Sequence, residues 1–330
     1  MPKMNTPRLD VLYRPACAAD AEALHAVHAG RVERDGVDRF STLEDVYSTG
    51  LLQEALQHAE AEGSQDQWLV AEVEDKVVGF SFINTWREDD GTWVYLIVGW
   101  VLPDWRGQGI GTHMLEQMEA RARQLAASQH PGEKAELAAN ASSTEQDSTA
   151  LLLYAGYRAG YTVLEMDLPA AMPIPQHPLP QDVEIRPVLP EHLLPLAEGI
   201  GACYKNEYDS GRYAEDYDPT AYVASLAQPR HDPTLWRVAW AGEAIVGQVL
   251  TVIKDGRAEV FEVSVSPAWR RRGLGRALLS QALQELRRRG VQVIRLHTVA
   301  EFKTQAWTLY QSVGFRILKE FPRYRKEMGI

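Results

Sequence analysis

Two six-residue segments of this sequence have the residue types of a phosphate-binding loop. They share the pattern Arg-x-x-Gly-x-Gly and read Arg106-Gly107-Gln108-Gly109-Ile110-Gly111 and Arg270-Arg271-Arg272-Gly273-Leu274-Gly275. Each follows an apolar segment that closes on Pro and Trp and precedes an amphipathic one, so we expect a strand before each loop and a helix after it. Glycine has no Cβ to hold a phosphate away from the backbone, and a helix N-terminus attracts anions. The sequence therefore predicts two anion sites.

The surroundings of the loops exclude the better-known nucleotide signatures. A dinucleotide fingerprint needs Gly-x-Gly-x-x-Gly, and a P-loop needs a Gly-Lys-Ser/Thr ending. Neither pattern is present in either loop. The loops instead resemble the acetyl-CoA pyrophosphate loop of the GNAT acetyltransferase superfamily, whose pattern is Gln/Arg-x-x-Gly-x-Gly/Ala.

The loops belong to a long internal repeat. Tyr13-Arg14-Pro15 returns as Ile185-Arg186-Pro187, and Trp68-Leu69-Val70-Ala71 returns as Trp236-Arg237-Val238-Ala239. The order of the segments is kept while the spacing shrinks slowly, which indicates small length changes in loops. A repeat of this length indicates duplicated domains rather than solenoid units.

A proline-rich segment separates the two copies. Five prolines stand between Pro169 and Pro180, and such a segment forms neither helix nor sheet readily. We therefore expect an N-terminal domain at residues 1–168, a stiff linker at 169–181 and a C-terminal domain at 182–330.

Composition agrees with two ordinary globular domains. A chain of 330 residues with 45% apolar content can bury two cores. The two cysteines, Cys17 and Cys203, have no metal-ligand spacing, so we expect a reduced, cytoplasmic protein without a metal. The absence of a long apolar run and the net charge of −11 argue against membrane and nucleic-acid partners.

The pattern of apolar residues predicts alternating strands and helices, and hence an α/β fold. In the first copy we expect strands at 11–14, 69–73, 77–84 and 93–101, with helices at 19–28 and 110–125. In the second copy we expect strands at 183–186, 259–265, 291–299 and 315–319, a hairpin over 237–252, and helices at 274–289 and 304–312. The GNAT resemblance, which covers nearly the whole chain, implies two tandem domains, each a mixed, mostly antiparallel sheet flanked by helices.

The same resemblance implies an N-acetyltransferase that moves an acetyl group from acetyl-CoA to a primary amine of a small molecule or peptide by direct attack. In that family a backbone N–H late on the strand before the loop holds the acyl carbonyl, a position that falls on Val101 and Val265. The expected cofactor-binding residues are Val101, Arg106, Gly107, Gln108, Gly109, Ile110, Gly111 and Thr112 in the first copy, and Val263, Ser264, Val265, Arg270, Arg271, Arg272, Gly273, Leu274, Gly275 and Arg276 in the second.

Candidates for proton transfer are present in the second copy. Family members carry a glutamate either eleven or eight residues before the loop, and these positions are Glu259 and Glu262. Strand alternation places the two on opposite faces, so we expect at most one of them to face the thioester directly. The resemblance also implies a general acid at Tyr310, four residues ahead of Gly314-Phe315.

The first copy lacks these groups. Tyr95, Val98 and Leu152 occupy the corresponding positions. It resembles the weaker half of tandem two-domain GNAT proteins, the mycothiol synthases among them, so we expect it to serve mainly as a structural partner. The open alternatives are an acetyl-CoA sensor without turnover and an enzyme for a longer acyl-CoA.

The acceptor amine is not identified by the sequence. Tyrosines and carboxylates between Cys203 and Asp218 suit a cationic amine, and they are equally typical of a polar surface. His297 is either a proton relay or a structural histidine. The chain is expected to be a monomer or a homodimer.

Overall fold

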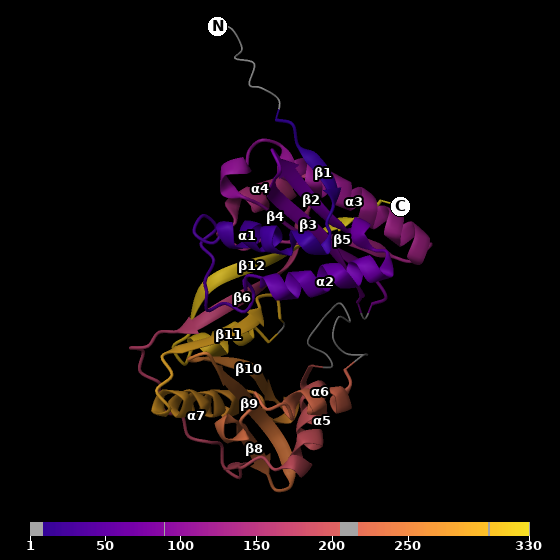
Figure 1. Cartoon of the computed structure of the whole chain (residues 1–330). Coiled ribbons are helices and arrows are strands. Elements are labelled where there is room, and N and C mark those ends of the chain that lie inside the picture. The colour runs from indigo at the N-terminus through magenta and orange to yellow at the C-terminus, as the bar shows by residue number, and fades with distance from the viewer. Residues whose placement is uncertain (1–8, 89, 205–216, 303, 330) are drawn as a thin grey trace. The chain divides into compact units, whose positions relative to one another are not determined.

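The computed structural model describes residues 9–88, 90–204, 217–302 and 304–329 (Figure 1). The chain forms two compact units, one of Met1–Gly160 with Pro322–Ile330 and the other of Tyr161–Phe321. Each contains a mixed sheet flanked by helices, so the predicted α/β class is confirmed. Residues 169–181 contain neither helix nor strand.

The sheet of the first unit has the strand order β1-β2-β3-β4-β5-β12, and its pairs are antiparallel except for the parallel pair β4·β5. The predicted apolar stripe of α3 is buried, from Ile110 and Met114 to Leu125. The strands are β1 (Leu12–Pro15), β2 (Trp68–Val73), β3 (Lys76–Arg87), β4 (Trp93–Val101), β5 (Ala135–Asn140) and β12 (Arg316–Glu327), and the helices are α1 (Ala21–Gly30), α2 (Thr49–Glu62), α3 (Ile110–Gln129) and α4 (Gln146–Tyr154).

The second unit repeats this plan with the strand order β6-β11-β10-β9-β8-β7, in which β10 and β11 are parallel. Helix α7 packs on one face of the sheet, and α5 and α6 lie on the other (Figure 1). The strands are β6 (Arg158–Leu168), β7 (Glu184–Arg186), β8 (Arg237–Ala241), β9 (Ala244–Lys254), β10 (Arg257–Val265) and β11 (Val293–Val299), and the helices are α5 (Leu193–Tyr204), α6 (Pro219–Leu226), α7 (Leu274–Arg288) and α8 (Ala306–Gln311).

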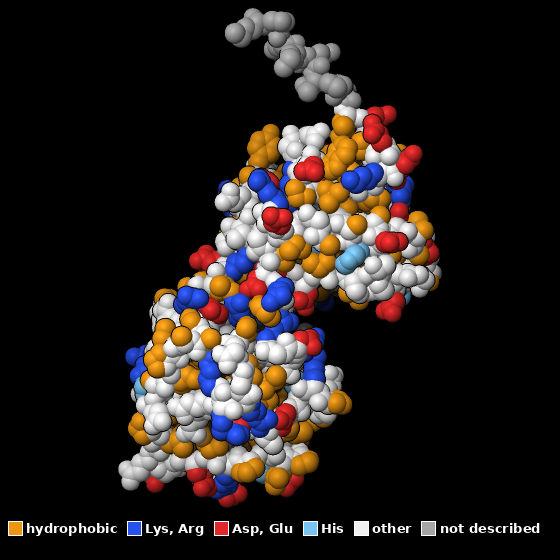
Figure 2. Space-filling view, turned by 60° about the vertical axis from the view of Figure 1, so that its left-hand side comes forward, with side chains coloured by type: hydrophobic (Ala, Val, Ile, Leu, Met, Phe, Trp, Pro, Cys, Tyr) orange, Lys and Arg blue, Asp and Glu red, His pale blue; other side chains and the backbone are white. Residues whose placement is uncertain are grey.

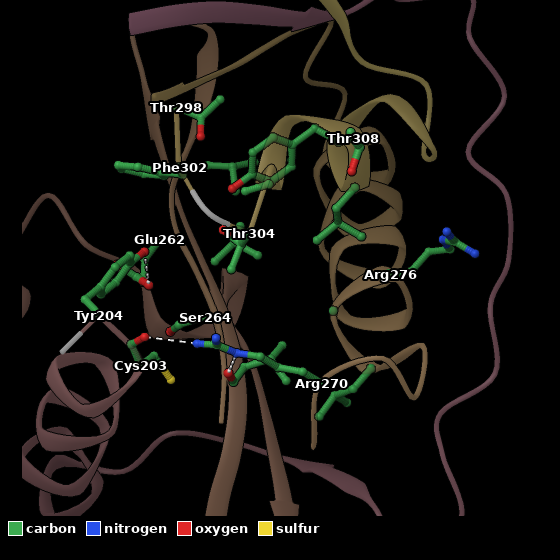
Figure 3. A pocket seen from close by; sticks show the side chains of 18 of the residues that line it. Cys203, Tyr204, Glu262, Ser264, Arg270, Arg276, Thr298, Phe302, Thr304 and Thr308 are labelled. Atoms are coloured by element: carbon green, nitrogen blue, oxygen red, sulfur yellow. Dashed lines mark hydrogen bonds between the residues drawn. The ribbon is translucent and has the colours of Figure 1, made fainter. Parts of the chain in front are cut away.

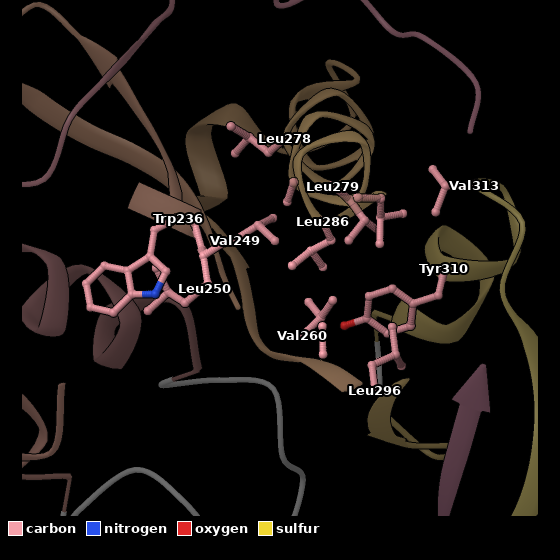
Figure 4. Close-up of a cluster of buried hydrophobic side chains, with 14 of the residues drawn as sticks. Trp236, Val249, Leu250, Val260, Leu278, Leu279, Leu286, Leu296, Tyr310 and Val313 are labelled. Carbon is pink, nitrogen blue, oxygen red and sulfur yellow. The ribbon is translucent and has the colours of Figure 1, made fainter. Parts of the chain in front are cut away.

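The core of the second unit is built around the predicted stripe of α7. Leu278, Leu279 and Leu286 are fully buried against Val249 of β9 and Val260 of β10 (Figure 4). Burying a leucine side chain contributes about 1.5–3 kcal/mol, so this stripe fixes α7 on the sheet. The loop that precedes α7 is thereby held at the end of β10.

Two strands are exchanged between the copies. Residues Val163–Leu168 of β6 pair with β11 of the second unit, whereas Arg323–Glu327 of β12 pair with β5 of the first. The last strand was expected at 315–319, but it continues to Glu327. The compact units therefore differ from the expected domains in these two strands, because a strand's partner depends on long-range pairing that local periodicity does not encode.

In each sheet the hydrogen-bonded ladder between the two central parallel strands stops before the strands themselves end. The β10·β11 ladder stops at Glu259 and Arg295, and the β4·β5 ladder stops at Ile97 and Ala139. Both strands of each pair continue beyond that point, and in each unit a pocket lined by both continuations lies beside the glycine-rich loop. The fold thus places two comparable sites.

The surface carries mixed charge. Basic and acidic side chains are interspersed on each unit over the face drawn in Figure 2, so the net charge of −11 is not gathered there in one patch. Within the described ranges, no helix combines the length and apolar character needed to cross a bilayer. Nor does any group of His, Cys, Asp and Glu side chains in that part of the chain have an arrangement that could hold a metal ion.

Candidate functional site

A cavity of about 570 Å³ in the second unit gathers most of the residues singled out from its sequence (Figure 3). Its walls are the second half of β10, the loop before α7, the end of β11 and the start of α8. Of the expected cofactor-binding residues, those that line it are Val263, Ser264, Val265, Arg270, Arg271, Gly273, Leu274, Gly275 and Arg276.

Two glycines of the loop are required for different steric reasons. Gly273 is the N-cap of α7 with φ +82°, and a Cβ built there would meet nothing within 4 Å. The space in front of the helix N-terminus is therefore open, as a phosphate cradle requires. At Gly275 a Cβ would lie 3.3 Å from Leu309 Cδ2 and 3.4 Å from Val265 Cγ2, so this glycine lets the helix approach its neighbours closely.

The three arginines of the loop also differ in what their side chains contact. The Arg270 side chain turns back, with Nε donating to the Val265 carbonyl at 3.1 Å and Nη2 donating to the Cys203 carbonyl at 3.0 Å. Arg272 lies over the Trp269 ring at 4.8 Å. Arg271 lines the pocket at φ +62°, a left-handed conformation that costs an L-residue roughly 1–2 kcal/mol. Arg270 thus secures the loop, while Arg271 supplies charge to the pocket.

Glu262 faces this pocket from a buried position. Its exposed fraction is 8%, and the Tyr204 hydroxyl donates to its Oε1 at 3.0 Å (Figure 3). Burial raises the pKa of Glu262 to about 7, although hydrogen bonds from Ser264 and Tyr204 act in the opposite direction. A carboxylate of this pKa can accept a proton near neutral pH.

Glu259 has a different environment and is not among the residues that line the pocket. A bulge in β10 between Val260 and Glu262 interrupts the simple alternation that separates the two glutamates. Glu259 Oε1 lies 3.4 Å from Nδ1 of His297, and this partner lowers the pKa of Glu259 in spite of burial. Glu259 is thus held as an anion by its neighbour.

Tyr310 lies on α8 and lines the same pocket. Figure 4 shows its ring among Val260, Leu296 and Val313, with the hydroxyl directed toward β10. Burial raises its pKa, and the nearby charge of Glu262 raises it further. The phenol therefore keeps its proton at neutral pH and can donate it.

His297 belongs to a buried ionic cluster that the sequence did not reveal. Its Nε2 lies 3.5 Å from Oε1 of Glu165 on β6, and its Nδ1 faces Glu259. Burial lowers the pKa of His297, but the two carboxylates outweigh burial and bring it to about 9. Glu165 is fully buried and reaches His297 only because β6 pairs with β11, so no local signal could have identified it.

The first unit has a comparable cavity of about 480 Å³. Its walls include Val101, Arg106, Gly107, Gly109, Gly111 and Thr112 from the predicted set, but not Gln108 or Ile110. Arg106 repeats the clamp of Arg270, with Nε donating to the Val101 carbonyl at 2.9 Å. Its Nη1 also forms ion pairs with Asp35 at 2.6 Å and with Asp147 at 3.3 Å.

The proton-transfer groups of the second unit have no counterpart at the matching positions of the first. Val98 stands on β4 at the place of Glu262, and Leu152 stands on α4 at the place of Tyr310. Tyr95 is buried in the core, where its hydroxyl contacts Nδ1 of His130 at 2.7 Å. Tyr154 lines the first pocket but is 87% exposed.

The segment from Cys203 to Asp218, expected from the sequence to form the wall for the acceptor amine, is described only in part. Lys205, Asn206, Glu207, Tyr208, Asp209, Tyr213, Glu215 and Asp216 lie outside the described residues. Of the wall's tyrosines, Tyr204 contacts Glu262, and the Tyr217 hydroxyl donates to the Ala197 carbonyl at 2.9 Å. The pocket is also lined by Thr298, Thr304 and Thr308, and Gln248 donates a hydrogen bond to Ser264 behind the lining; sequence patterns did not single out these four residues.

Comparison with known proteins identifies the class. The model of the acetyltransferase (GNAT) family matches residues 37–135 and 198–315, which together make up more than half of the chain. The chain therefore belongs to the GNAT acetyltransferase family, with two GNAT regions in tandem, and it is an acyltransferase.

Individual relatives agree with this class. The chain is 25% identical over 251 residues to the mycothiol acetyltransferase of Catenulispora acidiphila, covering 73% of this chain and 74% of that protein. It is 38% identical over 74 residues to the [ribosomal protein bS18]-alanine N-acetyltransferase of Escherichia coli K12, covering 22% of this chain and 49% of that protein.

Two solved structures share the fold over nearly the whole chain. A GCN5-related N-acetyltransferase from Sphaerobacter thermophilus superposes with a TM-score of 0.68 at 22% identity, covering 98% of this chain and 96% of that one. A tandem GNAT protein from the clavulanic acid biosynthesis pathway superposes with a TM-score of 0.61 at 15% identity, covering 97% and 99%.

Proposed function

We propose that this protein is an acetyl-CoA-dependent N-acetyltransferase whose second unit transfers an acetyl group to a primary amine of a small molecule or peptide. The observation that carries the proposal is the position of Glu262, a buried carboxylate on a pocket that also contains an open helix N-terminus and Tyr310. One relative is named a mycothiol acetyltransferase and another an N-acetyltransferase of an alanine of ribosomal protein bS18, and the second name supports an amine acceptor.

The residues present fit the cofactor. The N–H groups at the start of α7, unobstructed at Gly273, suit a pyrophosphate, and Arg271 and Arg276 add positive charge. Acetyl-CoA would supply an acetyl thioester, whose carbonyl carbon is open to attack by an amine. The end of β10 at Val265 would hold the acyl carbonyl in line with the attacking nitrogen.

Proton transfer is assigned to two side chains. Glu262 takes the proton from the amine nitrogen, because its carboxylate faces the pocket and its pKa is about 7. The hydroxyl of Tyr310 gives its proton to the leaving sulfur, since burial keeps that hydroxyl protonated. Glu259 is not assigned this role, because His297 already holds it as an anion outside the pocket lining.

The first unit is proposed as a structural partner. Its loop is intact, but its cradle arginine is paired with Asp35 and Asp147, and the base and acid positions hold Val98 and Leu152. Such a unit keeps the geometry of an anion site without a group aligned to accept a proton.

The proposal is tested by turnover with a panel of amines. The wild type should release free thiol from acetyl-CoA with at least one amine, Glu262→Gln should lose at least about a hundredfold in kcat, and Tyr310→Phe should lose less. Calorimetric titration should show that CoA affinity is retained in both variants. Thiol release unchanged by Glu262→Gln would contradict the assignment. Tight acetyl-CoA binding without turnover of any amine would favour a sensor, and turnover only with longer chains would change the donor.

A further inference from the structure

Glu262 lies beside a buried, hydrogen-bonded pair of polar side chains, Gln248 and Ser264. Gln248 on β9 pairs with Ser264 on β10 in the ladder register, and Gln248 Nε2 donates to Ser264 Oγ at 2.6 Å. Gln248 is 2% exposed and Ser264 is 5% exposed. Burying an amide and a hydroxyl in a sheet is unfavourable unless both are hydrogen-bonded, so this pair is costly to disturb.

Ser264 and Glu262 are both buried on β10. The two residues are separated by one position on β10, and both side chains line the pocket (Figure 3). A serine hydroxyl has one proton and two lone pairs, so accepting the Gln248 N–H leaves its proton to donate elsewhere. The Glu262 carboxylate accepts a hydrogen bond from the Tyr204 hydroxyl at 3.0 Å, and the Ser264 hydroxyl beside it acts to lower the pKa of Glu262.

The first unit shows that the fold does not require these polar side chains. The β3·β4 register pairs Phe80 with Trp100, and these residues stand where Gln248 and Ser264 stand in the second unit. Their rings lie 5.4 Å apart, and Val98 takes the place of Glu262. Apolar side chains therefore fill these three positions in one copy, and polar side chains, two of them hydrogen-bonded to each other, fill them in the other.

We propose that Gln248 and Ser264 are positioning residues for acyl transfer: Gln248 orients the Ser264 hydroxyl, and Ser264 holds the Glu262 carboxylate in the orientation that accepts the amine proton. The inference rests on the proposed role of Glu262 as the base. In place of the cofactor contact expected from the sequence for Ser264, it assigns to Ser264, together with Gln248, an effect on the Glu262 carboxylate.

A change of Ser264 leaves the other ionisable groups near Glu262 in place, so its effect on the pKa of Glu262 has a definite direction. Tyr204 lies on α5, Tyr217 lies just before α6, Tyr222 lies on α6 and Tyr310 lies on α8. The charged groups that line the same pocket are Arg270, Arg271, Arg276 and His297. None of these is altered by changing Ser264. Loss of its hydroxyl removes one donor to the ionised form, so the titration of Glu262 should move toward higher pH.

The test compares Ser264→Ala with Ser264→Thr, which keeps a hydroxyl at the same atom. In Ser264→Ala we expect the acidic limb of the kcat/KM profile to move up by about one pH unit and kcat to fall roughly tenfold. Ser264→Thr should restore both. Gln248→Met, which keeps the length of the side chain but cannot donate, should move the limb in the same direction.

Thr251→Val is the matched control. Thr251 is fully buried on the same strand as Gln248, and its hydroxyl donates to the Leu235 carbonyl at 3.3 Å, away from the pocket lining. Its loss should lower the denaturation midpoint and leave the acidic limb in place. A shift of the limb in Thr251→Val would mean that any buried hydroxyl has this effect, which would overturn the proposal.

An infrared titration of the protein without acetyl-CoA reads the same carboxyl group independently of turnover. The band that disappears in Glu262→Gln should titrate at higher pH in Ser264→Ala than in the wild type. If the band and the limb stay in place in Ser264→Ala while Glu262→Gln remains inactive, the positioning role is wrong and the role of Glu262 stands. If Glu262→Gln is fully active, the proposed function itself fails.

Discussion

At the scale of single residues, the site of the second unit depends on the raised pKa of the Glu262 carboxyl group. Glu262 is buried beside apolar strand residues, which disfavours its charged form and brings its pKa to about 7, while hydroxyl donors limit the shift. A group with this pKa exists half as acceptor and half as acid at neutral pH. That balance suits a base that must take a proton and release it in each cycle.

This balance predicts a specific pH profile. Glu262 must be ionised to accept a proton, so kcat/KM should rise with pH through about 7, falling about tenfold for each unit below the midpoint. Glu262→Gln should remove this limb as well as most of the activity. Steady-state rates between pH 5 and 9 measure it. Glu259→Gln serves as the control and should keep the limb; a limb that vanished only in Glu259→Gln would transfer the base to that residue.

His297 predicts a pH dependence of stability rather than of rate. Burial alone would lower its pKa, but Glu165 and Glu259 raise it to about 9 in the folded state. A raised histidine pKa stabilises the fold at pH values below its unfolded value of about 6.5, and this stabilisation is lost as pH rises through about 9. The loss should be on the order of 1–2 kcal/mol.

Urea unfolding at pH 6.5 and pH 9.5 measures this effect. The wild type should lose more stability over that interval than His297→Gln, which carries no titrating imidazole. Equal losses in the two proteins would show that the cluster of Glu165, His297 and Glu259 does not couple to folding in this range.

At the scale of elements, the two loops offer an internal comparison. Gly109 and Gly273 are both helix N-caps, with φ +86° and φ +82°, and a Cβ at either would meet nothing within 4 Å. Valine at either position would strain the backbone equally, by about 1–2 kcal/mol. It would also place a branched side chain in the space that a pyrophosphate needs.

We expect the two valine variants to be destabilised equally but to differ in CoA binding and turnover. Gly273→Val should weaken CoA binding strongly and abolish turnover, whereas Gly109→Val should leave turnover intact and at most reduce the number of CoA molecules bound. Calorimetric titration gives the stoichiometry, and thermal unfolding confirms that both variants fold. Turnover lost only in Gly109→Val would reverse the assignment of the active unit.

At the scale of the whole molecule, the exchange of β6 and β12 makes each unit depend on the other copy's sequence. Residues Arg323–Glu327 complete the first sheet, and Lys326 Nζ reaches the buried carboxylate of Glu119 on α3 at 2.7 Å. Arg325 Nη2 forms a second ion pair with Glu88 at 3.1 Å. The end of the chain is therefore part of the first unit's core.

Lys326→Met tests this dependence. Among the described residues, it leaves Glu119 with an ion pair to Arg123 at 3.0 Å. Because the carboxylate is only 8% exposed at its side chain, the loss should be about 1–2 kcal/mol. Denaturant unfolding followed by the first unit's tryptophans measures it. Glu119→Gln combined with Lys326→Met should be less destabilised than the sum of the single changes, and strict additivity would refute a direct interaction.

Much of the fold and of the candidate site was predictable because it depends on local sequence patterns. The glycine spacing of both loops, the apolar stripes of α3 and α7, and the contrast between Glu262 with Tyr310 and Val98 with Leu152 need only one segment at a time. Helix periodicity and the requirement for an unhindered helix N-terminus are properties of neighbouring residues. The class of fold, the duplication and the candidate residues follow from the sequence.

Other features depend on contacts between distant segments and appear only in the tertiary structure. The choice of Glu262 over Glu259 for the pocket depends on a bulge after Val260 and on His297 from another strand. The hydrogen bond from Arg270 to the Cys203 carbonyl, the link from Gln248 to Ser264 and the exchange of β6 with β12 join residues from different elements of the chain. Burial and strand pairing decide these features, and both are set by the whole sheet rather than by the order of residues within any one segment.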